Sequence, residues 1–294
     1  MKGGDTGGTG LSYKPGHLKD VNVYLDPVAL LQPLRWRRGR KIFPLSMSDL
    51  FGDWVPDEWI DKIFAVMALS PQHTFQVLTK RPKRMREYML ERWQGTPAHP
   101  EMGIPAGGET GRRSKVWAAA EEILESLGLT DPDKEKLWDE NGSLKASQFD
   151  WPLPNVWLGT SICDQANAED FVFELLGAPA ALHFVSAAPL LGQINLRRLA
   201  VKGGGWYDAL AGFRDVKESP APEGTIGWVL TEGESGKEAR ETIPDWFRML
   251  RDQCAATGAK FHHKQNGEFL HGKRVGLKKA GRLLDGVEHN EFPT

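Results

Sequence analysis

The sequence has few cysteines, no long apolar run and almost no net charge, and each shortage excludes a class of protein. Its only cysteines, Cys163 and Cys254, form no C-x-x-C pair, which excludes a disulfide framework and a zinc knuckle. No apolar stretch approaches the roughly 20 residues that span a bilayer. The formal net charge of −2 over 294 residues argues against a globally basic coat for nucleic acid.

Short catalytic motifs are also missing. There is no G-x-G-x-x-G turn, Walker loop, H-E-x-x-H helix or G-x-S-x-G elbow. His262 and His263 are adjacent in a predicted strand, so their side chains point to opposite faces and cannot chelate one ion together. The first residues lack the apolar core of a signal peptide. We therefore expect a cytoplasmic protein with no metal site and no membrane partner.

The sequence does contain six short apolar runs that predict strands. Each run is rich in Val, Ile, Leu or Phe, the residues that suit a buried strand. The runs are KIFPLS (41–46), TFQVLTK (74–80), NVWLGTS (155–161), LHFVSA (182–187), IGWVLTE (226–232) and KFHHKQ (260–265).

Helical segments separate most of these runs. Apolar side chains recur at helical spacing in residues 56–70, 81–93, 164–177 and 243–258. Asp164 is a candidate N-cap, and Gly177 and Gly258 are candidate helix stops. Apolar strands that alternate with helices predict an α/β fold with a parallel sheet covered on its outer face. Without a dinucleotide-binding turn, six such units favour a partial (β/α)6 barrel of the TIM type over a Rossmann sheet.

Three stretches interrupt this alternation. Residues 1–20 are Gly-rich and are predicted to form a flexible N-terminus. Residues 94–150 are an insertion between the second and third strands, with helical periodicity over residues 114–129. Residues 192–224 are a second insertion without clear periodicity. The rest of residues 21–294 is predicted to be a single partial barrel that carries both insertions.

Polar side chains follow the predicted strands at their carboxyl ends, which open on one face in a parallel (β/α) layout. Any one of them could be an ordinary loop residue or a helix cap. The whole set, with two carboxylates and two lysines converging, predicts a pocket for a small molecule, although no catalytic residue is assigned. The candidate ligand-binding residues are Ser46, Ser48, Asp49, Thr79, Lys80, Arg81, Thr160, Ser161, Ser186, Glu232, Glu234, Lys264 and Gln265.

Two kinds of charged segment allow two interpretations each. In TEGESG (231–236), Glu232 and Glu234 could accept hydrogen bonds from an amine, but a turn with solvated glutamates has the same pattern. The basic clusters at residues 35–41 and 80–86 could hold phosphates or could be solvated helix ends. The candidates for nucleic-acid contact are Arg35, Arg37, Arg38, Lys80, Arg81, Lys83 and Arg84.

Several longer motifs occur in order and carry a family resemblance. They are SMSDLFGDWVPDEWIDKIFAVMALSPQHTFQVLTKRPKRM, WPLPNVWLGTSICDQ, PLLGQINL, WVLTEGESGKEAR and RDQCAATGAKFHHKQNGEF. With them the chain resembles, over residues 27–292, the family of phage and prophage proteins named after phage gene products thirty-seven and sixty-eight, a domain of unknown function. The resemblance implies a partial barrel of the radical-SAM type that binds S-adenosylmethionine.

The chain departs from the family pattern at four places. Members usually carry an N-terminal G-C-x(6)-C-x-x-C-Y-A segment, whose thiolates would hold a [4Fe-4S] cluster. Nothing before residue 20 resembles that segment, so a cluster is expected only if a missing upstream segment supplies the cysteines. Ala188 stands where the family usually has glutamate, Glu232 replaces the first glycine of G-G-E-S-G, and Asn266 replaces the tryptophan of K-Q-W-G.

Two functions therefore remain open. The first is an N-terminally truncated or degenerate radical-SAM-like protein that binds S-adenosylmethionine or a related small molecule but cannot cleave it. Glu232 and Glu234 would then lie near the amino group of the ligand. The second is a non-catalytic phage accessory protein that binds nucleic acid or a host protein through its basic clusters. Either would act in the cytoplasm of a bacterial host cell, and the substrate and oligomeric state are left open.

Overall fold

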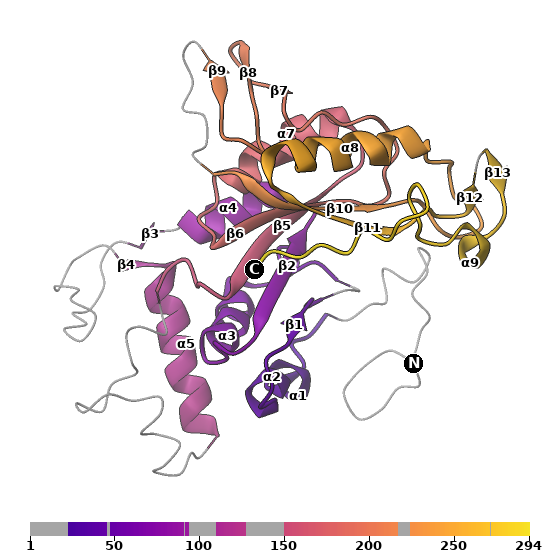
Figure 1. The fold of residues 1–294 in the computed structure, drawn as a ribbon. Coiled ribbons are helices and arrows are strands. Elements are labelled where there is room, and N and C mark those ends of the chain that lie inside the picture. Colours follow the sequence, from indigo (N-terminus) through magenta and orange to yellow (C-terminus); the bar gives the residue numbers. More distant parts are fainter. Residues whose placement is uncertain are drawn as a thin grey trace.

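Six parallel strands form one curled sheet, a half-barrel, at the centre of the molecule (Figure 1). The computed structural model describes residues 23–45, 48–90, 92–93, 110–127, 150–216, 224–270 and 272–294. All neighbouring strands of this sheet are parallel, in sequential order. The order is β1 (Lys41–Ile42), β2 (Thr74–Thr79), β5 (Val156–Ile162), β6 (Leu182–Ala187), β10 (Ile226–Glu232) and β11 (Lys260–Gln265). The predicted α/β class and the six predicted strands are confirmed.

One strand is shorter than the sequence predicts. The apolar run at residues 41–46 suggested a strand of six residues, but β1 ends at Ile42. Pro44 has no backbone N–H to give to a sheet ladder. Leu45 then adopts a positive φ of 59°, which no strand residue has. Ser46 lies outside the described residues.

Helices cover the outer, convex face of the sheet. The covering helices are α3 (Asp57–Ala68), α4 (Pro82–Leu90), α7 (Gln165–Leu176) and α8 (Pro244–Thr257). The predicted cap of α7 is confirmed, because the Asp164 carboxylate accepts a hydrogen bond from the backbone N–H of Asn167 at 2.9 Å. The predicted stop of α8 is also confirmed, since Gly258 has a left-handed φ of 83°. In the described part of the chain, every helix is too short or too polar to cross a membrane.

The two faces of the sheet have different cores. Outward side chains such as Phe75, Val185 and Phe261 join the large core beneath the helices. Inward side chains form a smaller aromatic cluster on the concave face, in which Phe184 and Trp228 have ring centroids 5.6 Å apart. This alternation follows from the period of two in a strand, where successive side chains point to opposite faces.

Both predicted insertions contain regular structure. In the first, β3 (Arg92–Trp93) pairs antiparallel with β4 (Thr110–Gly111), and α5 (Arg112–Ser126) confirms the predicted helical periodicity. In the second, β7 (Leu199–Ala200), β8 (Gly205–Tyr207) and β9 (Arg214–Val216) form an antiparallel sheet. No periodicity predicted this sheet, because strands of two or three residues are too short to show one.

Short elements complete the two ends of the chain. At the N-terminal side, α1 (Pro27–Leu30) and α2 (Gln32–Arg35) precede β1. After β11 come the hairpin of β12 (Phe269–Leu270) and β13 (Lys273–Arg274) and the short helix α9 (Leu277–Ala280).

The C-terminal residues return along the free edge of β11 and reach the concave face (Figure 1). The backbone N–H of His263 donates to the carbonyl of His289 at 2.9 Å. The Trp228 indole donates to the carbonyl of Glu291 at 3.0 Å, and the ring of Phe292 packs 4.9 Å from that of Trp228. Lys41 of β1 lies 3.9 Å over the same Phe292 ring. The C-terminal segment therefore connects the two edge strands of the half-barrel.

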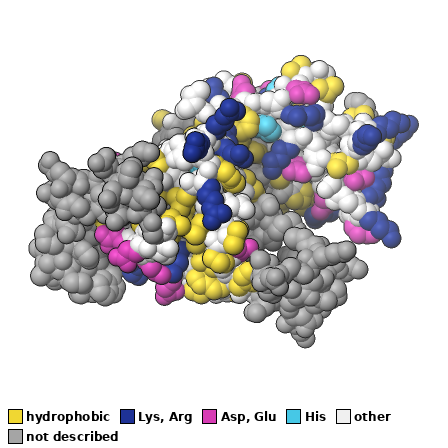
Figure 2. All heavy atoms as spheres, turned by 90° about the horizontal axis from the view of Figure 1, so that it is seen from below, with side chains coloured by type: hydrophobic (Ala, Val, Ile, Leu, Met, Phe, Trp, Pro, Cys, Tyr) yellow, Lys and Arg dark blue, Asp and Glu magenta, His cyan; other side chains and the backbone are white. Residues whose placement is uncertain are grey.

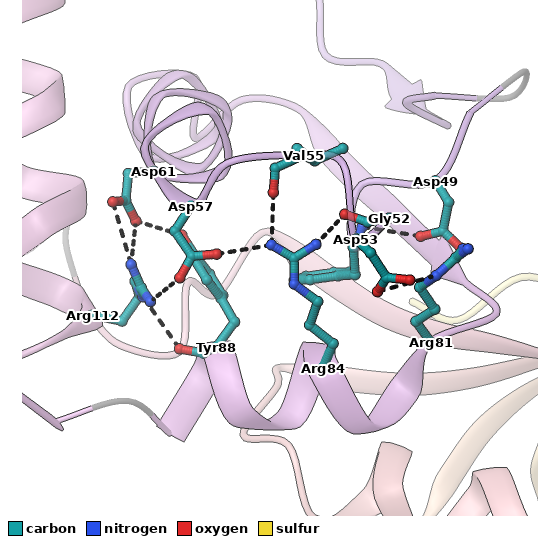
Figure 3. A network of polar contacts seen from close by, with 11 residues as sticks. Asp49, Gly52, Asp53, Val55, Asp57, Asp61, Arg81, Arg84, Tyr88 and Arg112 are labelled. Carbon is teal, nitrogen blue, oxygen red and sulfur yellow. Dashed lines mark hydrogen bonds and ion pairs between the residues drawn. The ribbon is translucent and has the colours of Figure 1, made fainter. Parts of the chain in front are cut away.

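A chain of ion pairs fixes the insertion helix to the barrel helices (Figure 3). Arg112, at the start of α5, is fully buried and bonds Asp61 at 3.0 Å and Asp57 at 3.0 Å. Tyr88 of α4 donates its hydroxyl to Asp61 at 2.8 Å. Asp57 also pairs with Arg84 at 3.0 Å. Each charge in this network has an opposite charge or a hydrogen-bond partner beside it.

Candidate ligand-binding site

The strand register divides the predicted site residues into inward and outward sets. Leu78, Phe184 and Leu230 belong to the inner cluster, and side chains two residues apart in a strand share a face. Lys80, Ser186 and Glu232 follow them by two positions and so face the inside of the half-barrel at its carboxyl end. Ser161 pairs in register with Ser186 and has the same orientation. We call this carboxyl end of the concave face the mouth.

Three predicted threonines point the other way. Thr79, Thr160 and Thr231 are buried beneath the helices. Thr79 donates its hydroxyl to Asp49 at 2.6 Å, and Thr160 donates to the backbone carbonyl of Thr79 at 2.9 Å. The Thr231 hydroxyl bonds Nδ1 of His263 at 2.9 Å. All three hold neighbouring segments together, and Thr79 also borders a pocket at the mouth.

Asp49 attaches the loop after β1 to the end of β2. Its carboxylate accepts hydrogen bonds from the Thr79 hydroxyl, from the backbone N–H of Lys80 at 3.0 Å and from the Arg81 guanidinium at 3.1 Å. Arg81 also lies 3.8 Å from Asp53 and 4.7 Å over the ring of Trp54. Asp49 and Arg81 therefore position the loop, and their charges largely compensate each other.

A pocket of about 380 Å³ lies on the β1, β2 and β5 side of the mouth. Six predicted site residues line it, namely Ser48, Asp49, Thr79, Lys80, Arg81 and Ser161. Four further lining residues were not predicted, namely Phe43, Leu45, Trp54 and Leu78. Alternation along the strands would have predicted that Phe43 and Leu78 face inward. The depth of the pocket could not be predicted in this way, because it depends on the loop that carries Trp54.

The β10 and β11 side of the mouth carries an ion pair. Lys264 Nζ lies 3.4 Å from Glu232 Oε2, and the Gln265 amide donates to the other carboxylate oxygen of Glu232. A register shift after Thr231 brings Gln265 opposite Glu232, so that both β11 residues reach the same carboxylate. Glu232, Lys264 and Gln265 are all partly exposed and accessible to a ligand.

Glu234 is already engaged by a residue that the sequence reasoning missed. Its carboxylate accepts two hydrogen bonds from the Arg240 guanidinium at 2.8 Å and one from the Arg240 backbone N–H at 2.7 Å. These bonds lower the pKa of Glu234 to about 2. Residues 234–240 are thus closed into a loop, and the only sequence signal was an arginine six positions after a glutamate.

Ser186 and Lys80 both lack side-chain partners among the described residues. The Ser186 side chain is 2 % exposed, and its hydroxyl makes no hydrogen bond with the described residues. A buried hydroxyl without a partner is unfavourable by about 1–3 kcal/mol, so each such group in a native protein calls for an explanation. Lys80, which follows β2, is exposed and forms no ion pair with the described residues.

A buried network supports the mouth from behind. His263 bonds Thr231 through Nδ1 and Asn266 through Nε2, and burial lowers the pKa of His263 to about 4. The Asn266 amide donates to the carbonyls of Ala280 and Leu283, at 3.0 and 3.1 Å. Gly233 packs so closely here that a Cβ would lie 2.1 Å from the Asn266 carbonyl oxygen. Asn266 therefore binds the chain after α9 to β11.

The thiols of this chain do not fit an iron–sulfur cluster. Cys254 is buried in α8, and burial raises its pKa to about 12. Cys163 follows β5 and is partly buried. A cluster held by three cysteines needs one thiolate more than these two residues supply. Across the described ranges, no three His, Cys, Asp or Glu side chains are grouped to hold a metal ion.

The two basic clusters lie at opposite ends of the sheet. Lys41 pairs in register with Thr74, the first residue of β2, whereas Lys80 follows the last. In the second cluster Arg84 is engaged by Asp57 and by the carbonyls of Gly52 and Val55. In the first cluster Arg35, Arg37 and Arg38 are exposed and form no ion pair with the described residues.

These features define an α/β half-barrel protein with a polar mouth at the carboxyl ends of its parallel strands. The chain belongs to a family described as "Protein of unknown function (DUF5131)", which it matches over residues 6–293. A comparison with curated proteins and another with solved structures each found no match.

Proposed function

We propose that the protein binds S-adenosylmethionine, or a related small molecule with an amino-acid group, at the mouth of the half-barrel. The observation that carries this proposal is the partly exposed ion pair of Glu232 and Lys264, 3.4 Å apart. An amino-acid group is a zwitterion, so its ammonium would bind the carboxylate of Glu232 and its carboxylate would bind the ammonium of Lys264. The free hydroxyl of Ser186, on the neighbouring strand, is a further hydrogen-bonding group for the same ligand.

The type of barrel belongs to the same proposal. We propose that the half-barrel is of the radical-SAM-like type, as the resemblance to the phage family implies, and support comes from its six parallel strands in sequential order. Because Cys163 and Cys254 do not fit a cluster, the proposal includes ligand binding and no cleavage step. Glu234 would contribute indirectly, through the loop that it closes with Arg240.

Calorimetric titration with S-adenosylmethionine tests this proposal. The unmutated chain should bind, and Glu232→Gln should bind roughly 10- to 100-fold more weakly, the usual loss for a charge-assisted hydrogen bond. Glu238→Gln, an exposed glutamate six positions later, is the matched control and should bind normally. Absence of binding by the unmutated chain contradicts the proposed function, and equal affinity of Glu232→Gln removes the role of Glu232.

A second candidate function is nucleic-acid binding through Arg35, Arg37 and Arg38. It is favoured by the exposure of these three arginines and by their lack of ion pairs with the described residues. Seen from below, the surface carries Lys and Arg side chains beside hydrophobic ones, with Asp and Glu side chains between them (Figure 2). Replacing the three arginines by glutamine should reduce the slope of log K against log salt concentration, for binding of a single-stranded nucleic acid, by roughly 2. Lys83→Gln should change this slope little. An unchanged slope in the triple variant would eliminate this candidate.

A further inference from the structure

The pocket of about 380 Å³ has a chemical character of its own. It is called here the Phe43 pocket, and its lining includes Phe43, Leu78, Lys80 and Ser161. Glu232 and Lys264 do not line it, so it is separate from the ion pair on the other side of the mouth. Its volume lies within the range of roughly 300–1,000 Å³ that is typical of small-molecule sites.

Two exposed aromatic rings form the rim of the pocket. Phe43 is 45 % exposed and Trp54 is 49 % exposed, although both are large apolar side chains. Trp54 is held in place, because Arg81 lies 4.7 Å over its ring and its ring occupies the space where a Cβ of Gly52 would be, 2.6 Å away. Phe43 stacks on no other ring among the described residues. A preorganised Trp54 beside an unpartnered Phe43 provides a surface for a flat ring.

One cation in the pocket is available to a ligand. Arg81 is neutralised by Asp49 and Asp53, whereas the exposed ammonium of Lys80 has no ion-pair partner among the described residues. The Ser48 and Ser161 side chains add hydroxyl donors to the same pocket. An anionic group is the natural partner of a free lysine flanked by hydroxyls.

The loop that carries the rim is conformationally strained. Leu45 has a φ of 59°, and Asp285 is the only other non-glycine residue with a positive φ in the described ranges. Leucine rarely adopts this conformation, and strain of this kind persists where the surrounding structure imposes it, often at ligand sites. The strained Leu45 itself lines the pocket, next to Phe43.

We infer that the Phe43 pocket binds a nucleoside monophosphate, whose base stacks on Phe43 and Trp54 and whose phosphate pairs with Lys80. A purely apolar ligand would leave the Lys80 ammonium desolvated without a partner, which is unfavourable. Inorganic phosphate would make no use of the two exposed rings. A nucleotide uses both halves of the pocket. This inference does not depend on the proposed amino-acid site, because the two sites share no lining residue.

Calorimetry with adenosine monophosphate, adenosine and inorganic phosphate tests the inference. The unmutated chain should bind the nucleotide at least tenfold more tightly than either of the other two. Lys80→Ala should reduce nucleotide affinity roughly tenfold or more and bring it to the level of adenosine, because only the phosphate contact is lost. Phe43→Ala should weaken the nucleotide and adenosine alike, because base stacking is lost. Phe43→Leu, which keeps the apolar side chain, serves as a second variant should Phe43→Ala fold poorly.

Two controls separate this site from its surroundings. Lys83→Ala removes the same charge outside the pocket and should bind the nucleotide normally. Glu232→Gln should also bind the nucleotide normally, whatever its effect on S-adenosylmethionine. The inference is overturned if the unmutated chain does not bind the nucleotide, if Lys80→Ala and Phe43→Ala bind it unchanged, or if S-adenosylmethionine displaces it competitively.

Discussion

Two polar networks of the molecule differ in how completely their groups are paired. In the first, Arg112, Asp61, Tyr88 and Asp57 satisfy one another within 3.0 Å across three helices (Figure 3). Burial raises the pKa of the Asp61 carboxyl, and the guanidinium of Arg112 opposes that shift. Such a network leaves no group for a ligand and connects the insertion helix to the barrel.

The mouth is the second network, and it is incomplete. Glu232 and Lys264 are paired but partly exposed, Lys80 is unpaired among the described residues, and the Ser186 hydroxyl is buried without a partner. Charge density alone therefore does not mark a binding site. Both networks are rich in charge, but only the mouth has polar groups that a further molecule could satisfy.

The largest expected effect on stability comes from breaking the first network, that of Arg112, Asp61, Tyr88 and Asp57. Arg112→Met should destabilise the protein by about 3–5 kcal/mol, because Asp61 would remain buried without its guanidinium partner. Lys62→Met is the matched control, since Lys62 joins α3 to α5 through an exposed pair with Glu122 and should contribute less than about 1 kcal/mol. Urea denaturation measures both variants. A small loss for Arg112→Met would mean that the network is not the connection between α5 and the barrel.

A smaller effect, dependent on pH, is expected from His263 behind the mouth. Burial lowers its pKa from 6.5 to about 4, so the folded protein binds fewer protons than the unfolded chain between these values. Stability should therefore fall as the pH falls from 6.5 towards 4, by up to about 3 kcal/mol. His263→Gln should flatten this part of the curve of unfolding free energy against pH. If the variant and the unmutated chain show parallel curves, His263 does not carry the dependence.

The smallest effects on stability are expected from removing either of two hydroxyls on adjacent strands, one of which is hydrogen-bonded and the other not. Thr231→Val should cost about 1–3 kcal/mol, because Nδ1 of the buried His263 loses its partner. Ser186→Ala should raise stability by about 1–3 kcal/mol, because it removes a buried hydroxyl that has no partner among the described residues. Thermal denaturation of the pair is the measurement. A large loss for Ser186→Ala would place its hydroxyl in the folded network and would remove it from the ligand proposal.

Much of the barrel could be predicted from local patterns. Six apolar runs gave the six strands, and the residues at the ends of α7 and α8 gave their caps, because these signals depend on nearest neighbours along the chain. The sheet of β7, β8 and β9 could not be predicted, since its short strands exist only through their pairing with one another. The early end of β1 could have been read from Pro44.

The candidate site was predictable in outline and not in detail. The carboxyl ends of the strands do meet at one mouth, and Lys80, Ser161, Ser186, Glu232 and Lys264 reach its inner side. Counting alternate residues would have separated them from Thr79, Thr160 and Thr231, which face the helices. The ion pairs of Glu234 with Arg240 and of Asp49 with Arg81 could not be predicted from this alternation, because they depend on how loops fold back.

By itself, the sequence determined the order of strands and helices, the inner and outer face of each strand, and the family to which the chain belongs. These depend on periodicity and on motifs, which are properties of the chain alone. Only the tertiary structure decided which charges are paired and which remain available. Pairing depends on distances of a few ångströms between segments far apart in the chain, such as Arg112 with Asp61 or Lys41 with Phe292. The rim of Phe43 and Trp54 is of the same kind, since it exists only because the loop after β1 folds over the end of β2.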